Sequence, residues 1–369
     1  MTKEPNMIDR FAETFAPREL TQGYFNMARL FNIDPMDLLD GRKTTGIYHD
    51  VTYNKFLKWI QTGGRQKGDR TGTGTLSRFG YQMRFDIRNG VVPLLTGKKM
   101  HLPAIIHEII WYLSGSSNIK YLQDNGVRIW NEWADENGEL GPVYGFQWRN
   151  WPVTEVLGYE DSKVEGDDTY YVGAVVREGR IDQIKQLRED LLNNPDSRRL
   201  MVSAWNVGQI QDMKLPPCHY TFQFYTEEMT REERVEWLNA NTGTECTTFT
   251  DEHMDYMKVP KRFISCMMNQ RSADAFLGVP FNISQYAIIT HLFGKVLNMA
   301  PREFIWSGGD CHIYNNLKDQ VEEQLKRIPY ESPRIKIADS VDNLENLKYN
   351  DFEVLDYRFH PAIKGQVAV

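Results

Sequence analysis

The sequence predicts an α+β fold in which one large sheet, with its strands mostly in sequential order, is surrounded by helices. Segments with alternating apolar and polar residues, such as 76–87 and 221–225, recur along the chain and are typical of strands. Longer segments such as 103–113 are apolar on nearly every side and indicate buried helices. The 369 residues are 41% hydrophobic and 25% charged, a composition that can bury a large core.

Residues 1–50 are expected to form an N-terminal helical extension, because Pro35 and Gly41 break its short helical pieces. Residues 51–369 form the expected main domain. Apolar spacing, alternation and Gly-rich turns predict its elements in chain order: a helix at 53–62, a loop at 69–75, a strand at 76–87, a helix at 103–113, a helix at 180–192, strands at 200–204, 221–225 and 263–268, a helix at 283–297, a strand at 304–307 and a helix at 315–327.

Two stretches interrupt this order and are expected to be surface insertions. The first, at about 153–170, is acidic and Gly-rich. The second, at about 227–259, is strongly charged, and a loop is expected at 239–242.

Charge and cysteine content limit the class of protein. A net charge of −7 disfavours stable nucleic-acid binding, because a surface that follows phosphates needs a basic excess. The four cysteines form no CxxC pair, which indicates reduced thiols and a cytoplasmic location. An apolar N-terminal leader and an apolar run of membrane-spanning length are both missing, so secretion and membrane insertion are not expected.

Cys218 stands behind Pro216 and Pro217 at the start of an alternating, aromatic-rich strand. The prolines restrict the backbone, so the thiol is held in a fixed position, as a nucleophile requires. A free cysteine is also commonly a small buried apolar residue, and this segment alone leaves both roles open. His219 follows directly and points to the opposite face of a regular strand, which disfavours a simple Cys-His pair.

Glu108 lies in an apolar helix, where burial disfavours the charged form of a carboxylate and suits it to acid-base chemistry near neutral pH. A hydrogen-bonded structural glutamate is an equally open interpretation. His107-Glu108 resembles the start of a zinc-protease helix, but Trp111 stands where a second histidine ligand would be, so no metal is expected.

Arginines at two places indicate an anion site. Arg198 and Arg199 follow Ser197, and Arg271 precedes Ser272; guanidinium groups bind phosphate with two hydrogen bonds at once. Surface ion pairs are the plainer alternative. The Gly-rich run 71–75 beside Arg70 lacks the Gly-Lys-Ser/Thr of a nucleotide-triphosphate loop, but it could close over one phosphate. Trp130 and Trp133 could stack on a flat ring or fill a core.

In combination and order, these segments resemble the thymidylate synthase family, over about residues 52–369. The segments that carry the resemblance are 69–75, His107-Glu108 with Trp111, 129–138, 140–145, 196–199, 217–219, 270–274, 276–282, Gly309-Asp310 with His312 and Tyr314, and the terminal Val367-Ala368-Val369. The resemblance implies a thymidylate-synthase-like fold with a large mixed sheet, and a homodimer whose subunits meet sheet to sheet.

The resemblance also implies a reaction. Cys218 would add to C6 of dUMP, and the activated C5 would take a methyl group from 5,10-methylenetetrahydrofolate to give dTMP. The catalytic residues implied are Cys218, Glu108, Tyr144, His219, Asn282, Asp274 and Trp130. The substrate would be bound by Arg70, Gln223, Arg271, Ser272, His312 and Tyr314, with Arg198 and Arg199 acting from the partner subunit. Four guanidinium groups would lower the pKa of the thiol.

On the folate side, the resemblance implies a cofactor site that closes over the substrate. Its residues would be Lys98, His101, Ile129, Trp133, Asp274, Leu277, Gly278, Phe281, Val367 and Ala368. Closure of the terminal segment excludes water when hydride leaves the folate.

Two alternatives accompany this prediction. A deoxyuridylate 5-hydroxymethyltransferase, as in some bacteriophage members of the family, would add water instead of hydride and release tetrahydrofolate. Asn131, where aspartate is common, is one departure near Trp130 that could change the water network. A non-catalytic nucleotide- or RNA-binding relative is disfavoured, because Cys218, Glu108 and Asn282 are all present.

Overall fold

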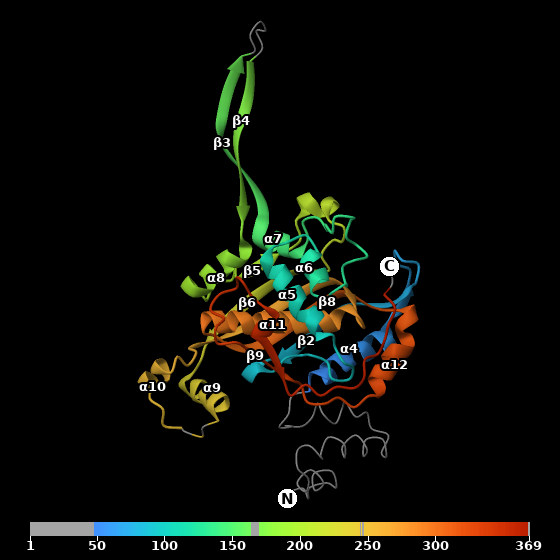
Figure 1. Ribbon diagram of the computed structural model, residues 1–369, viewed down its shortest axis with the longest axis vertical. Helices are drawn as coiled ribbons and strands as arrows, with labels where there is room; N and C mark the ends of the chain where they lie inside the picture. Colours follow the sequence, from blue (N-terminus) through green and yellow to red (C-terminus); the bar gives the residue numbers. More distant parts are fainter. Residues whose placement is uncertain (1–47, 164–169, 244, 246, 368–369) are drawn as a thin grey trace, which may run out of the picture.

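A six-stranded sheet forms the centre of the molecule (Figure 1). The computed structural model describes residues 48–163, 170–243, 245 and 247–367, with the side chains of 160–172 left out of the description. The expected N-terminal extension therefore falls almost entirely outside the described residues, as does Ala368.

The strand order confirms an α+β fold with a mixed sheet. From one edge to the other the strands are β1 (Arg65–Lys67), β2 (Thr75–Asp86), β8 (Ala300–Tyr314), β7 (Arg262–Asp274), β6 (His219–Glu228) and β5 (Met201–Ser203). The β7 and β8 strands are parallel, and the other neighbours are antiparallel. The sheet is less sequential than expected, because β8 lies between β2 and β7.

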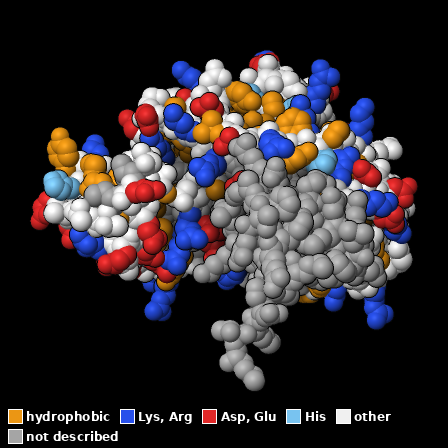
Figure 2. Space-filling model, turned by 90° about the horizontal axis from the view of Figure 1, so that it is seen from below, with side chains coloured by type: hydrophobic (Ala, Val, Ile, Leu, Met, Phe, Trp, Pro, Cys, Tyr) orange, Lys and Arg blue, Asp and Glu red, His pale blue; other side chains and the backbone are white. Residues whose placement is uncertain are grey.

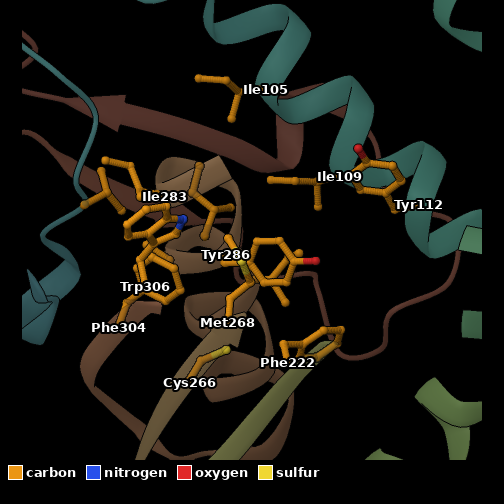
Figure 3. Close-up of a cluster of buried hydrophobic side chains, with 14 of the residues drawn as sticks. Ile105, Ile109, Tyr112, Phe222, Cys266, Met268, Ile283, Tyr286, Phe304 and Trp306 are labelled. Carbon is orange, nitrogen blue, oxygen red and sulfur yellow. The ribbon is translucent and has the colours of Figure 1, made fainter. Parts of the chain in front are cut away.

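Two apolar helices cover one face of the sheet. They are α5 (Leu102–Ser114) and α11 (Gly278–Leu297), and both were predicted from their apolar segments. Figure 3 shows Ile109 of α5 and Ile283 and Tyr286 of α11 in one cluster with Phe304 and Trp306 of β8. All these side chains are buried, which is why α11 can be apolar on nearly every side.

Further helices and two short strands complete the main body. The α4 helix (His49–Gly63) packs against β2, and the C-terminal α12 (Lys318–Lys326) lies beside it (Figure 1). The remaining elements of the body are α6 (Lys120–Asp124), α7 (Tyr144–Asn150), α8 (Gln183–Asn193), β9 (Arg334–Ile337), β10 (Phe352–Leu355) and the short 3-10 turns at Arg88–Gly90, Val207–Asp212, Asn315–Leu317 and Tyr349–Asp351.

The stretch expected as the first insertion is a long hairpin that projects from the body (Figure 1). Its strands are β3 (Trp151–Lys163) and β4 (Tyr170–Ile181), which pair with each other alone. The strand β4 takes in residues 180 and 181, so the helix expected from 180 begins only at Gln183, where the Asp182 carboxylate accepts from the Lys185 N–H.

The stretch expected as the second insertion contains two helices, α9 (Arg231–Thr242) and α10 (Asp251–Tyr256). The expected loop at 239–242 is wrong, because these residues form the last turn of α9. A capping box between Thr230 and Glu233 starts this helix, and Gly243 ends it with a positive φ of 70°. Figure 2 shows acidic side chains gathered on this corner of the molecule.

The sheet's register brings distant segments to one edge. Because β7 and β8 are parallel, their carboxyl ends meet there, and Asp274 lies opposite His312. The neighbouring antiparallel strands begin at the same edge: Thr75 pairs with Tyr314, and His219 pairs with Gln270. Residues near the carboxyl ends of two strands and the amino ends of two others therefore converge on one place.

Neutral histidines in the core make stability depend on pH. Burial lowers the pKa of His291 to about 4, although the ring donates a hydrogen bond from Nε2 to the Val91 carbonyl. Between pH 6.5 and 4 the unfolded chain binds a proton at this residue that the folded chain does not bind. Its contribution to stability is therefore present above pH 6.5 and declines as the pH falls toward 4.

We predict that His291→Gln, which keeps a donor for Val91, makes the free energy of unfolding less dependent on pH. Between pH 6.5 and about 4 the slope should decrease by at most ~1.4 kcal/mol per pH unit. Urea unfolding at a series of pH values measures it. His253→Gln, at an exposed position of α10, is the control; equal slopes for His291→Gln and the parent would contradict the prediction.

Candidate active site

A cavity of about 800 Å³ opens at the edge of the sheet where these strand ends converge. It brings together most of the residues predicted from the sequence. Those that line it are Arg70, Glu108, Ile129, Trp130, Trp133, Tyr144, Cys218, His219, Arg271, Ser272, Asp274, Leu277, Gly278, Phe281, Asn282, His312, Tyr314 and Val367.

Cys218 is held in the cavity wall by its backbone. Its N–H donates to the Tyr144 hydroxyl at 2.9 Å, and its carbonyl accepts from the Arg271 N–H at 2.8 Å. The Arg271 guanidinium also donates to the carbonyls of Pro216 and Pro217, both at 2.9 Å. The two prolines thus present the thiol, and they also place a cation beside it.

Tyr144 occupies a strained position at the start of α7, with a φ of 23°. Gly145 permits it: a Cβ on that residue would come within 2.4 Å of the Tyr112 carbonyl oxygen. The close approach of α7 to α5 therefore requires a glycine there. It directs the Tyr144 hydroxyl to the backbone of Cys218.

Burial raises the pKa of the Cys218 thiol, while Arg271 and the hydrogen bond from Tyr144 oppose the rise. We had expected four guanidinium groups to lower this pKa. Arg70 and Arg271 line the cavity, but Arg198 and Arg199 are exposed elsewhere on the chain. Within one chain, the removal of the thiol from water therefore outweighs the arginines.

His219 is directed away from the thiol. Its Nδ1 is 2.8 Å from the Tyr286 hydroxyl, and its ring stacks on Tyr144 with centroids 4.2 Å apart. Burial lowers the pKa of His219 to about 3, so the ring is neutral at physiological pH. This arrangement agrees with the expectation that Cys218 and His219 form no simple catalytic pair.

Glu108 lies at the base of the cavity and is fully hydrogen-bonded. Its Oε1 accepts from Trp130 Nε1 at 2.5 Å and from the Tyr112 hydroxyl at 2.9 Å, and its Oε2 accepts from Gln285. Burial raises the pKa of Glu108, and these three donors counteract the rise. Such a carboxyl group can take up and release a proton closer to neutral pH than an exposed one.

Asn282 projects from the first turns of α11 with a defined amide orientation. Its Oδ1 accepts from Gln270 Nε2 at 3.1 Å, and the Gln270 oxygen accepts from Trp306 Nε1 at 2.9 Å. An amide oxygen can accept twice and an amide nitrogen can donate twice. Asn282 therefore keeps one acceptor position and can present a donor to a ligand in the cavity.

The cavity lining includes cations and hydroxyl groups. Asp69 accepts from the N–H and the hydroxyl of Thr71, both at 2.6 Å, and so fixes the loop that carries Arg70. With Arg271, this loop gives the wall two guanidinium groups, which suits a bound phosphate.

His312 also lines the cavity and is oriented by a network of ion pairs. Its Nδ1 is 3.2 Å from Asp310, which also accepts from Ser77 and Lys67. Burial raises the pKa of Asp310, but the hydrogen bonds from Lys67 and Ser77 keep it below its usual value. The imidazole is thereby held beside Tyr314, with ring centroids 5.1 Å apart.

Another part of the lining is largely apolar and suits a flat ring. It is formed by Ile129, Trp133, Leu277 and Phe281, and the half-buried Asp274 contributes a carboxyl group beside them. The Asp274 carboxylate accepts from the backbone N–H groups of Phe276 and Leu277. The terminal segment reaches this wall through Val367, and Asn316 holds it by donating to the Gln366 carbonyl.

Lys98 and His101 do not line the cavity. The buried Lys98 ammonium donates to the Phe276 carbonyl at 2.5 Å and so supports the wall from behind. Burial lowers the pKa of Lys98 to about 7, against the nearby charges of Asp274 and Asp50. His101 is exposed and caps α5, accepting from the Ala104 N–H at 3.2 Å.

Gln223 also lies outside the cavity, in a groove of about 450 Å³ on the other face of the sheet. The cause is an irregularity in the β6–β7 register between His219 and Thr221, which inverts the alternation along β6. Phe222 and Phe224 consequently face the core, and Gln223 donates to the Arg198 carbonyl at 3.3 Å.

Several residues of the site were missed from the sequence. Lys67, Tyr112, Gln270 and Asp310 all line the cavity. Tyr112 carried a usable signal, since it follows Glu108 by four residues in one helix and therefore lies on the same face. Nothing local to Gln270 indicates its bond to Trp306, which only strand pairing creates.

In the described part of the chain, no group of three or more His, Cys, Asp or Glu side chains is arranged to hold a metal ion. Among helices formed by described residues, none combines the length and apolar character needed to cross a membrane.

Comparison with known proteins agrees with this geometry. A family model for thymidylate synthase matches residues 51–369. The chain belongs to the thymidylate synthase family. A relative named thymidylate synthase from Coxiella burnetii (strain Dugway 5J108-111) is 46% identical over 318 residues, which are 86% of this chain and 99% of the relative. Relatives of the same name from Francisella philomiragia and Vesicomyosocius okutanii are 45% and 44% identical and show the same coverage.

The family and the relatives confirm the predicted fold class and the prediction of an enzyme of the thymidylate synthase kind. The names of these relatives give no support to the hydroxymethyltransferase alternative.

We predict that Tyr144→Phe raises the pKa of Cys218 further, because the Tyr144 hydrogen bond counteracts the rise caused by burial. Alkylation by iodoacetamide should then need a higher pH, read at the Cys218 peptide by mass spectrometry. Tyr112→Phe is the matched control, since its hydroxyl is equally buried but bonds Glu108. Coincident pH profiles for Tyr144→Phe and the parent would refute the assignment.

Proposed function

We propose that this enzyme converts dUMP to dTMP by reductive methylation at C5, with 5,10-methylenetetrahydrofolate as co-substrate. The observation that carries the proposal is that Cys218, Glu108 and Asn282 open into one cavity that Arg70 and Arg271 also line. This set provides a nucleophile, an acid-base group, an amide for base recognition and a binding site for a phosphate.

In this proposal the Cys218 sulfur adds to C6 of the uracil ring. The electron pair of the C5–C6 double bond moves toward O4, so C5 becomes nucleophilic and attacks the methylene carbon of the folate. The C5 proton leaves next, with Tyr144 as the candidate for removing it. Elimination of the folate, hydride transfer to the methylene on C5, and release of the sulfur then give dTMP and dihydrofolate.

Glu108 and Asn282 serve the uracil ring. The Asn282 amide has an acceptor for N3–H and a donor for O4, and that pair distinguishes uracil from cytosine. Glu108 handles protons at O4 and at the folate nitrogen through water, with His219 as a neutral member of the network. Burial raises the pKa of Glu108, which suits this exchange near neutral pH.

The other residues bind the two substrates. Arg70, Arg271 and Ser272 hold the phosphate, while His312 and Tyr314 bind the deoxyribose hydroxyl. The apolar wall fits the pterin and its aryl ring: Ile129, Trp133, Leu277, Gly278 and Phe281 pack against them, and Asp274 bonds the pterin. Trp130 shields the methylene, and the terminal segment with Val367 and Ala368 closes over it. We place this reaction in the cytoplasm.

We further propose a homodimer in which the uncovered face of the sheet meets its partner. Phe79 is 84% exposed on this face and Tyr225 is 62% exposed, which is unusual for large apolar residues of a central sheet. Arg198 and Arg199 are exposed next to the Gln223 groove. From there each subunit could supply two guanidinium groups to the phosphate site of the other.

The reaction is tested by incubating the enzyme with dUMP and methylenetetrahydrofolate. We expect dTMP by mass, dihydrofolate by absorbance, and loss of tritium from C5. Cys218→Ser should abolish turnover and leave dUMP binding largely intact, since a hydroxyl is a far poorer nucleophile at neutral pH. A hydroxymethyl product with tetrahydrofolate, or turnover by Cys218→Ser, would overturn the proposal.

Subunit mixing tests the dimer. Cys218→Ser should be inactive and Arg199→Ala only weakly active, but a hybrid dimer would contain one site with both native residues. Because half of randomly mixed dimers are hybrids, activity should recover to about a quarter of the parent value. Activity after mixing that equals the average of the separate variants would exclude action between subunits.

A further inference from the structure

A continuous series of hydrogen bonds runs behind the cavity wall, from β8 to the Glu108 carboxylate. Trp306 donates to Gln270 at 2.9 Å, Gln270 donates to Asn282 at 3.1 Å, and Asn282 donates to Gln285 at 3.4 Å. Gln285 then donates from Nε2 to Glu108 Oε2. Gln285 joins the amide of Asn282 to the carboxylate of Glu108 and has no role in the proposed mechanism.

The direction of this series is fixed at its first member. An indole N–H can only donate, so the Gln270 group facing Trp306 must be the amide oxygen. The Gln270 nitrogen therefore donates to Asn282, and the Asn282 nitrogen faces the oxygen of Gln285. The nitrogen of Gln285 is left to donate to Glu108, which receives it as a carboxylate.

Gln285 is placed to act on two groups without touching a ligand. Its side chain is fully buried, with 0% exposure, and it is not part of the cavity lining. It lies three residues after Asn282 in α11, so both side chains lie on one face of that helix. Gln285 connects α11 to α5, and among the described residues no other side chain bonds both Asn282 and Glu108.

We propose that Gln285 is a positioning residue that ties the amide orientation of Asn282 to the ionised state of Glu108, an inference that rests on the proposed reaction with dUMP. One end of its amide keeps Asn282 turned for uracil. The other end gives Glu108 Oε2 a donor that favours this oxygen without a proton.

The proton position on Glu108 follows from this arrangement. A proton on Oε2 would face the N–H of Gln285, so two donors would meet. The Gln285 amide would then have to turn over, and its nitrogen would face the nitrogen of Asn282. Protonation of Glu108 at Oε2 therefore disturbs the amide orientation that recognises uracil. The orientation of Asn282 for uracil and the unprotonated Oε2 of Glu108 favour each other.

Discrimination against cytosine follows from the same series of hydrogen bonds. Cytosine offers an acceptor at N3 and a donor at its amino group, so it requires the Asn282 amide to be inverted. The inverted amide would set its nitrogen against the nitrogen of Gln270 and its oxygen against the oxygen of Gln285. Two unmatched contacts in a buried place oppose this inversion.

The other titratable groups that face Glu108 do not change charge near neutral pH. They are Tyr112 of α5, Tyr144 of α7 and Tyr286 of α11, whose pKa values burial raises well above their usual value. His219 of β6 contacts Tyr144 and Tyr286, and burial lowers its pKa to about 3. Because Gln285 bonds Glu108 directly, a change that its substitution causes in the acid limb of kcat at saturating substrate reports on Glu108.

The test uses two substitutions at Gln285. One removes both hydrogen bonds of its amide, and the other changes only the bond to Glu108. Gln285→Met keeps the length of the side chain and removes both contacts. Its acid limb of kcat should move up by about one pH unit, the effect of one lost donor to a charge. Its preference for dUMP over dCMP, measured as a ratio of Kd values by calorimetry, should fall about tenfold.

Gln285→Glu keeps the acceptor for Asn282 and changes only the end that faces Glu108. Its Kd ratio should stay within about twofold of the parent. At alkaline pH the introduced carboxyl group loses its proton beside the Glu108 carboxylate, and the two adjacent charges repel each other. The kcat of this variant should therefore fall on the alkaline side. Gln324→Met is the matched control: this buried glutamine of α12 donates to Asn54 and does not line the cavity, so both readouts should match the parent.

An unchanged acid limb and Kd ratio in Gln285→Met would overturn the proposal and leave Gln285 a packing residue. Equal changes in Gln324→Met would overturn it as well, because they would show a general effect of destabilisation. If the parent releases no tritium from C5 of dUMP, the proposed function has failed. An active parent with an unaltered Gln285→Met excludes only the role of Gln285.

Discussion

The burial of α11 between the sheet and α5 is the constraint on which the site depends. One helix carries Gly278, Phe281 and Asn282 into the cavity on its first turns, and its later turns are locked in the core. The helix begins at Gly278, just after the turn in which the Asp274 carboxylate accepts from the N–H groups of Phe276 and Leu277. A rotation or shift of α11 would therefore move the base-recognition amide and the apolar wall together.

Parallel pairing of β7 and β8 supplies the second part of this arrangement. It brings Asp274 beside His312, although 38 positions separate them in the sequence. Local sequence preference cannot produce a contact between residues so far apart in the chain. Strand pairing of this kind holds the parts of the site together. The cavity is consequently a property of the sheet edge, with Arg70 on a loop, Arg271 on β7 and part of the apolar wall on α11.

The sequence predicted the parts of this protein that have local signals. The apolar segment at 103–113 and the alternation around Thr221 gave α5 and β6, and the ordered motifs gave Cys218, Glu108 and the phosphate arginines. Gln223 shows the limit: a single irregularity in register between His219 and Thr221 put it on the far face. The sequence pattern also gave a wrong prediction at 239–242, where polar residues end a helix because Gly243 provides the cap. It gave no indication of Gln285, whose partners come from two different helices.

The β3–β4 hairpin changes how the molecule moves through a solvent. Thirteen residues of extended strand reach about 40 Å from the body, and only the two strands support each other. Diffusion and gel filtration respond to extension rather than mass, so a chain of 43.1 kDa with such an arm will behave as a larger particle than a compact one. A dimer would carry two such arms, so static light scattering, which measures mass directly, is the appropriate measure of assembly.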